Sequence, residues 1–133
     1  MLLESSAFPF VRMDYGQSGP GGLDASLAAF AALLTRKQAF VLIGHGAGGQ
    51  QQDHEQRRQL ALWMKAHREG LRRFVLALVY IAPETKDRQG AEATAEMYEK
   101  FWGYPMLVTS SETQAKAMAT ALLAEHALAQ ADR

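Results

Sequence analysis

The sequence predicts a single-domain α/β protein with a four-stranded, mostly parallel sheet and helices on its faces. The first observation is that four apolar runs alternate with four segments whose apolar residues recur at helical spacing, in the order β-α-β-α-β-α-β-α. The second is the run Phe74–Ile81, which is apolar throughout and typical of a central parallel strand covered on both faces. This alternation implies right-handed crossovers between neighbouring parallel strands.

The N-terminal half is predicted to contain two strand–helix units. The strands are expected over Phe8–Tyr15 and Ala39–Ile43. Between them, the glycine- and proline-rich stretch 16–22 is predicted to be a loop, followed by a helix over residues 23–34. The glycine-rich turn Gly44–Gly49 follows the second strand, and the next helix is predicted to run from residue 53 to residue 67 or slightly beyond.

The C-terminal half is predicted to add two further units. Pro83 ends the third strand, and residues 84–90 are interpreted as a polar connection. The helix predicted over Ala91–Trp102 is expected to bury four residues, Ala95, Tyr98, Phe101 and Trp102. A short strand over Tyr104–Thr109 leads to a last helix from residue 111 to about residue 128. Ser111 and Gln114 are expected to cap this helix.

The composition excludes several classes of function. Fourteen basic and fourteen acidic residues balance, so no overall charge attracts nucleic acid or an anionic membrane. The absence of cysteine excludes disulfides, thiol nucleophiles and cysteine-ligated metal centres. The first residues do not resemble a signal peptide, and no apolar run approaches the roughly 20 residues of a membrane span. We therefore expect a cytoplasmic protein, and we predict no cofactor.

The glycine-rich turn is the main candidate for a ligand site. Ligands of α/β sheets tend to bind beyond the carboxyl ends of the strands, and glycine amides at a helix start suit an anion. The candidate ligand-binding residues are Asp14, Tyr15, His45, Gly46, Gly48, Gly49, Gln50 and Ser110. However, the spacing of the glycines matches neither a Walker A loop nor a dinucleotide fingerprint. A flexible connection would also account for this turn.

Catalysis and metal binding have weaker support. His45 could act as a general base assisted by Asp14 or Ser110, provided that these side chains converge to roughly 3 Å or through one water. No complete catalytic motif is present, so an enzyme is the least favoured reading, and no catalytic residue is assigned. Two histidines with the i, i+4 spacing of a zinc helix are also missing, so we predict no metal site.

The helix after the glycine-rich turn has a basic side. Its candidate partner-binding residues are Arg57, Lys65, Arg68 and Arg72. A basic side of this kind could meet an acidic protein partner or a phosphate, although the solvated face of an amphipathic helix would also account for it. No exposed aromatic residues are expected beside these charges, so nucleic acid is not a predicted partner.

In its order and length of elements the chain resembles the STAS-like domains, which are related to anti-sigma-factor antagonists. The resembling segments are the helix Arg57-Arg58 to Trp63-x-Lys65-x-His67-Arg68 and the strand Tyr104-Pro105-x-x-Val108 before an alanine-rich helix. The resemblance implies a non-enzymatic regulatory domain that docks to protein partners, with a homodimer as one possible assembly.

The chain departs from this family in two places. Many members are switched by phosphorylation of a serine or threonine at the start of the helix after a central strand, and residues 45–53 contain neither. Only one N-terminal strand is evident here, rather than a hairpin of two. The alternation itself fits a STAS-like and a flavodoxin-like strand order equally well. A small-molecule or anion-binding protein that uses Gly44–Gly49 is the alternative function.

Overall fold

The computed structural model describes residues 1–17, 19–46 and 54–131, which form an α/β fold around one mixed sheet. The five strands of the described residues are β1 (Leu2–Glu4), β2 (Phe10–Asp14), β3 (Phe40–His45), β4 (Val75–Ile81) and β5 (Met106–Thr109). The helices are α1 (Gly22–Leu34), α2 (His54–Ala66), α3 (Arg68–Phe74), α4 (Thr85–Trp102) and α5 (Glu112–Ala131). The predicted α/β class is therefore confirmed, with one strand more than expected.

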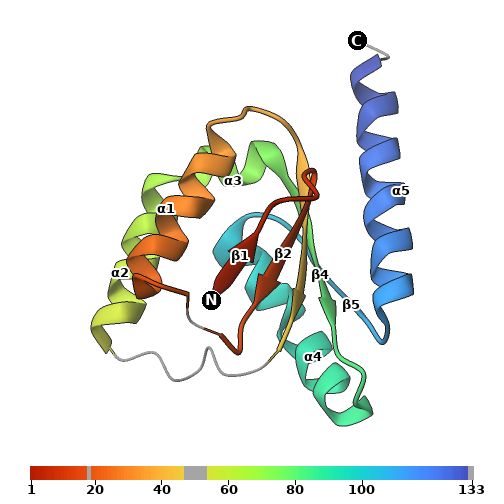
Figure 1. The fold of residues 1–133 in the computed structure, drawn as a ribbon. Coiled ribbons are helices and arrows are strands. Elements are labelled where there is room, and N and C mark those ends of the chain that lie inside the picture. Colours follow the sequence, from red (N-terminus) through yellow and green to blue (C-terminus); the bar gives the residue numbers. More distant parts are fainter. Residues whose placement is uncertain (18, 47–53, 132–133) are drawn as a thin grey trace.

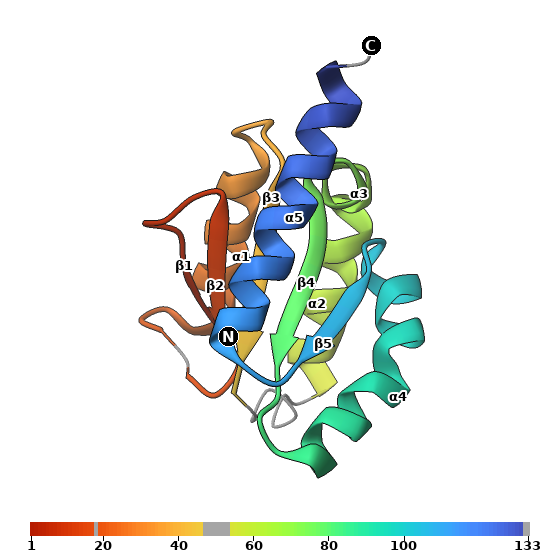
Figure 2. The ribbon, with the colours of Figure 1, turned by 90° about the vertical axis from the view of Figure 1, so that its right-hand side faces the viewer.

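The strands lie side by side in chain order, β1-β2-β3-β4-β5. β1 is antiparallel to β2, and the remaining neighbours are parallel. Because the chain advances in one direction through right-handed crossovers, its connecting helices gather on one face of the sheet. Figure 1 shows α1, α2 and α3 on that face and α5 on the opposite one. In Figure 2, α5 crosses in front of the sheet and α4 lies beside β5.

Two apolar cores fill the layers. The larger core lies between the sheet and the connecting helices and is rich in aromatic residues: the rings of Phe30 and Trp102 stack with their centroids 6.3 Å apart. The smaller core lies under α5, where Ala115 and Ala119 are buried against Val41, Ile43 and Val79. Met118, Leu122 and Leu123 pack around it and complete the inner face of α5.

The N-terminal hairpin is the first correction to the predicted fold. The sequence indicates a single strand there, but β1 pairs with β2 through the register Leu3↔Met13. β1 has only three residues, which is too short to show a period of two, so only its pairing reveals it. The observed strand order also excludes the flavodoxin-like order, 2-1-3-4-5, which the sequence left open.

The helices required three further corrections. The helix expected from residue 53 breaks at His67 into α2 and α3. The predicted connection 84–90 is helical from Thr85, and Arg88 holds this start by donating to the carbonyl oxygens of Ala82 and Pro83 at 3.0 and 3.1 Å. The first turns of α4 are polar and lack the apolar residues at helical spacing from which helices were predicted in the sequence. Phe101, expected to be buried, is 49% exposed because the inner face of α4 is formed by Tyr98 and Trp102.

Across the part of the chain that the structure describes, no helix combines the length and the apolar character needed to cross a membrane.

Candidate functional site

The carboxyl ends of β2 and β3 bring three predicted site residues together. Asp14 and His45 are paired neighbours in the parallel register, and the Tyr15 amide donates to the His45 carbonyl oxygen at 2.9 Å. The Asp14 carboxylate accepts from the amide of Gly16 at 2.9 Å. These contacts fix the backbone of the sheet edge. They use Asp14 as a turn-forming residue, as is common for aspartate in loops.

Gly44 and Gly46 each have a packing role in this edge. A Cβ atom at Gly44 would lie 2.9 Å from Leu78 Cδ1 and 3.0 Å from Tyr15 Cε2. Gly46 has φ +86°, and its Cβ would lie 2.9 Å from an Asp14 carboxylate oxygen and 3.0 Å from the Gly16 amide nitrogen. The first two glycines of the turn are therefore required by close packing and by a left-handed backbone.

The last three candidate residues of the turn, Gly48, Gly49 and Gln50, lie outside the described residues. Anion binding by the turn therefore stays a prediction. Between β2 and β5 the strand order shows no reversal, so the described sheet lacks the switch-point crevice in which doubly wound sheets bind ligands.

Two of the three side chains proposed for catalysis, those of Asp14 and Ser110, have other partners. No hydrogen bond joins the His45 imidazole to Asp14 or Ser110 within the described ranges. The Ser110 hydroxyl donates to the Gln114 side-chain oxygen at 3.1 Å, and the Thr109 hydroxyl donates to the same oxygen at 2.6 Å. Nor do residues 1–17, 19–46 and 54–131 place three or more histidine or acidic side chains where they could hold a metal ion.

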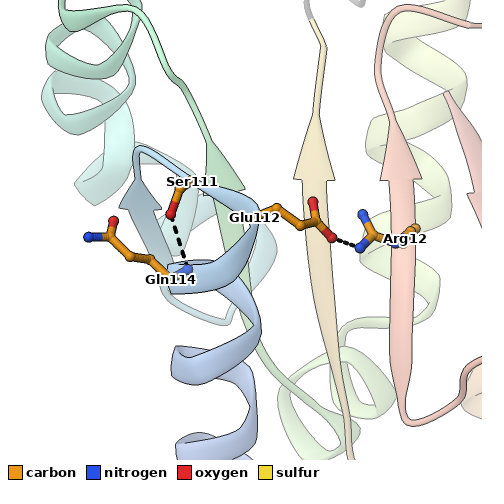
Figure 3. Close-up of polar contacts among 4 residues, drawn as sticks. All are labelled: Arg12, Ser111, Glu112 and Gln114. Atoms are coloured by element: carbon orange, nitrogen blue, oxygen red, sulfur yellow. Dashed lines mark hydrogen bonds and ion pairs between the residues drawn. The ribbon is translucent and has the colours of Figure 1, made fainter.

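Ser110 instead belongs to the start of α5. The Gln114 amide donates to the Ser111 hydroxyl at 3.1 Å, which confirms the predicted cap (Figure 3). Figure 3 also shows Glu112, in the first turn of α5, paired with Arg12 on β2. The loop after β5 therefore anchors α5 to the sheet, and its polar side chains are engaged in that anchoring.

Four tyrosines form a cluster that was not predicted from the sequence. The Tyr98 and Tyr104 hydroxyl oxygens are 3.1 Å apart, and a hydrogen bond links Tyr15 to Tyr98. Tyr80 packs against Tyr15, with ring centroids 6.0 Å apart, and donates to the Gly46 carbonyl oxygen at 2.7 Å. The four residues come from the turn after β2, from β4, from α4 and from the segment before β5, so no local pattern reveals their convergence.

Burial controls the ionisation of this cluster. Loss of water contact raises the pKa of Tyr15 and of Tyr98 well above the ordinary value for a phenol. The neighbouring phenols raise the pKa of Tyr15 further, whereas for Tyr98 the effect of Tyr104 is upward and the hydrogen bond with Tyr15 opposes it. Burial likewise raises the pKa of Tyr104, while its hydrogen bond to Tyr98 opposes the shift. Burial also raises the pKa of Tyr80. The phenols therefore remain neutral at physiological pH and serve as hydrogen-bonding groups.

The predicted partner side chains converge on the outer side of α2 and α3. Lys65, Arg68 and Arg72 line an open groove of about 640 Å³ together with Arg73, and Glu69 is its single acidic residue. We call Lys65, Arg68, Arg72 and Arg73 the basic surface. Arg57, on an earlier turn of α2, is exposed but does not line this groove. Arg73 also lines the groove, although it was not among the partner-binding residues predicted from the sequence.

The basic surface carries unneutralised charge. Among the described residues, ion pairs form only between Arg12 and Glu112 and between Glu96 and Lys100, so all four cations of the basic surface lack one. The two helices together hold six basic and two acidic side chains, a net charge of +4 in a chain whose net charge is zero. Positive charge is thus concentrated on this side of the molecule.

No protein-family model, curated protein or solved structure matches this chain. The function must therefore be inferred from the residues of the chain itself. Among the described residues, the basic surface is the place where charged side chains cluster without ion-pair partners.

Proposed function

We propose that this protein is a non-enzymatic regulatory domain that docks an acidic segment of a protein partner on its basic surface. The observation that carries this proposal is the groove lined by Lys65, Arg68, Arg72 and Arg73, in which no described carboxylate forms an ion pair with any of these cations.

The positive charge of the groove favours a negatively charged ligand. Like charges crowded on one face repel each other, and a ligand of opposite charge relieves that repulsion while its encounter is steered by the local field. Each exposed ion pair contributes only about 0–1 kcal/mol, so affinity requires several pairs formed together. An extended acidic segment can meet this requirement because it offers several carboxylates along one groove.

The surroundings of the cations favour a protein segment over nucleic acid. A single-stranded nucleic acid requires exposed aromatic rings for base stacking, and the lining of this groove includes none. The nearest aromatic residues are occupied: Trp63 stacks on His67 at 4.3 Å and Phe74 lies beneath the Arg73 guanidinium at 5.4 Å. An open groove also suits an extended chain better than a small ligand, which is usually enclosed.

The STAS-like resemblance supports the same function. The N-terminal hairpin, expected for such domains, accords with the β1–β2 pair, and the flavodoxin-like alternative does not fit the strand order. Since residues 45–53 contain no serine or threonine, we propose docking that is not switched by phosphorylation at that position.

Binding of a labelled polyglutamate peptide, followed by fluorescence anisotropy, tests this proposal. We expect saturable binding that weakens as salt rises from about 0.1 M to about 1 M, because the screening length falls from about 10 Å to about 3 Å. The variant Lys65→Glu/Arg68→Glu is expected to lower the affinity at least about tenfold, because it replaces attraction with repulsion at two positions.

The matched control is Lys86→Glu/Lys116→Glu, which changes the net charge equally but lies on α4 and α5. It should bind nearly as well as the unaltered protein. Equal losses in both variants would mean that only net charge matters and would refute a localised docking surface. Tighter binding of a single-stranded oligonucleotide of the same charge would reassign the surface to nucleic acid.

A further inference from the structure

The outer side of α4 carries an apolar stripe. Met97 is 74% exposed and Phe101 is 49% exposed, and they are two of the four large apolar side chains that are exposed among the described residues. Ala93 precedes them at the same spacing of four residues and is exposed as well. Residues four apart lie on one face of a helix. Ala93, Met97 and Phe101 therefore form a continuous line, which we call the α4 stripe.

Nothing in the described part of the chain covers this stripe. α4 lies beside the edge strand β5, and its inner side, formed by Tyr98 and Trp102, packs into the larger core (Figure 2). The stripe points away from that core. An exposed apolar line on an otherwise polar helix is a feature of interaction sites.

The order of residue sizes in the stripe makes it complementary to itself. A two-fold axis through Met97 would set two copies of α4 antiparallel, with Met97 facing Met97 of the other copy. The large Phe101 side chain would then lie over the small Ala93 of the other copy, and the reverse contact would follow by symmetry. Two-fold interfaces require this reciprocal pattern, in which residue i meets residue j and j meets i.

The charged side chains beside the α4 stripe can also be placed opposite each other by the same two-fold axis. Glu96 and Lys100 form an exposed ion pair along one flank, with 3.5 Å between Lys100 Nζ and Glu96 Oε1. In an antiparallel helix pair, the same flank of each helix faces its counterpart. Glu96 of one copy would therefore lie within reach of Lys100 of the other, and the two symmetric Glu96–Lys100 contacts would outnumber the single contact between the two Glu96 side chains beside the axis.

From this complementarity we infer that the protein forms a two-fold dimer through the α4 stripe, with a second copy of the chain as its occupant. The interface borders the basic surface, because Glu96 and Lys100 beside the stripe line a hollow together with Arg72. The dimer rests on the α4 stripe and does not require the docking proposed for the basic surface.

Sedimentation velocity on the full chain measures the assembly. The expected species has twice the monomer mass of 14.6 kDa. Met97→Glu and Phe101→Glu are expected to sediment as monomers, because each places two carboxylates in the apolar contact. Leu128→Glu, which alters an exposed leucine on α5, is the matched control and should remain dimeric. A monomeric unaltered protein, or dissociation of the control as well, would overturn the inference.

Charge exchange tests the orientation of the two copies. Glu96→Lys and Lys100→Glu should each weaken the dimer, because like charges then face each other across the axis. The double variant Glu96→Lys/Lys100→Glu should restore the original strength. Failure of this rescue, with the single variants weakened, would contradict the antiparallel arrangement.

A cysteine scan locates the axis. The chain contains no cysteine, so Met97→Cys introduces a single thiol. Because a disulfide requires Cα atoms within roughly 7 Å, Met97→Cys should form a covalent dimer rapidly under mild oxidation. Leu128→Cys should not. Equal crosslinking of both variants would indicate random collision and would exclude the proposed axis.

Discussion

The Tyr98 hydroxyl occupies the centre of the tyrosine cluster, where it contacts both Tyr15 and Tyr104. We predict that Tyr98→Phe lowers the free energy of unfolding by about 1–3 kcal/mol, because two buried hydroxyls then lose a partner. Tyr80→Phe is the control: its hydroxyl lies at an exposed position, and its loss should cost about 0.5–1 kcal/mol. Urea unfolding of the variants measures the difference. Equal effects would contradict a buried chain of phenols.

The same cluster predicts a loss of stability at alkaline pH. The folded state keeps Tyr15, Tyr98 and Tyr104 protonated, whereas in the unfolded chain these phenols ionise at their ordinary pKa near 10. The stabilisation is complete below that pH. Above it, the free energy of unfolding should fall by up to about 1.4 kcal/mol per pH unit for each tyrosine, because the unfolded state releases more protons.

Absorbance of tyrosinate at alkaline pH, followed together with circular dichroism, provides the measurement. The tyrosinate signal of these three residues should appear only as the fold is lost. Ionisation of all four tyrosines near pH 10 in a protein that keeps its circular dichroism would show that their hydroxyls are accessible to water.

Gly46 gives a prediction about the glycine-rich turn. Gly46→Ala should lower the free energy of unfolding by more than about 2 kcal/mol, because the left-handed conformation disfavours a side chain and the added Cβ meets Asp14 and Gly16. Gly22→Ala is the matched control. It also has a positive φ, of +62°, but its Cβ would have no neighbour within 4 Å, so it isolates the backbone contribution. If both substitutions lower the free energy of unfolding equally, the close packing at Gly46 does not contribute to stability.

At the scale of elements, α5 depends on its start. Its fully buried residues, Ala115 and Ala119, are small, and the Ser111 cap satisfies a backbone amide in its first turn. Ser111→Ala should therefore lower the free energy of unfolding by about 0.5–2 kcal/mol, and Ser111→Asp, which restores a capping oxygen, should recover most of it. Thermal unfolding tests this. A substitution to alanine without effect would mean that the helix is held by its apolar face alone.

The elements that the sequence predicted correctly are those with a strong local pattern. Phe74–Ile81 is apolar throughout and appears as β4 with its first residue moved into α3, and Ser111 caps α5 as expected. β1 and the first turns of α4 were missed because neither has an apolar period of its own. The three residues of β1 are recognised only by their pairing with β2. The start of α4 is held by Arg88, which donates a hydrogen bond to the Ala82 carbonyl oxygen.

The candidate site was predictable only in part for the same reason. Lys65, Arg68 and Arg72 follow a helical period, so their common side could be predicted from their spacing, whereas Arg73 next to Arg72 lines the same groove outside that spacing. The tyrosine cluster depends on contacts between residues distant in sequence. Asp14 and His45 were expected at one edge and do lie there, but their partners turned out to be backbone groups.

At the scale of the whole molecule, the order of the strands determines which surfaces remain free. A sheet that advances in one direction gathers its crossover helices on one face, and α5 covers the other (Figure 1). The basic surface on α2 and α3 and the α4 stripe both lie on the outer sides of these crossover helices. Two neighbouring surfaces are thus available, one for an acidic partner and one for a second copy, and they meet where Arg72 lines a hollow with Glu96 and Lys100.

Nuclear magnetic resonance mapping of the isotopically labelled protein during titration with the polyglutamate peptide tests the docking claim most directly. We expect progressive shifts confined to α2, α3 and their immediate neighbours, centred on Lys65, Arg68 and Arg72, and reversed by added salt. Shifts spread evenly over every basic residue, or centred on the turn at His45 and Gly46, would contradict it.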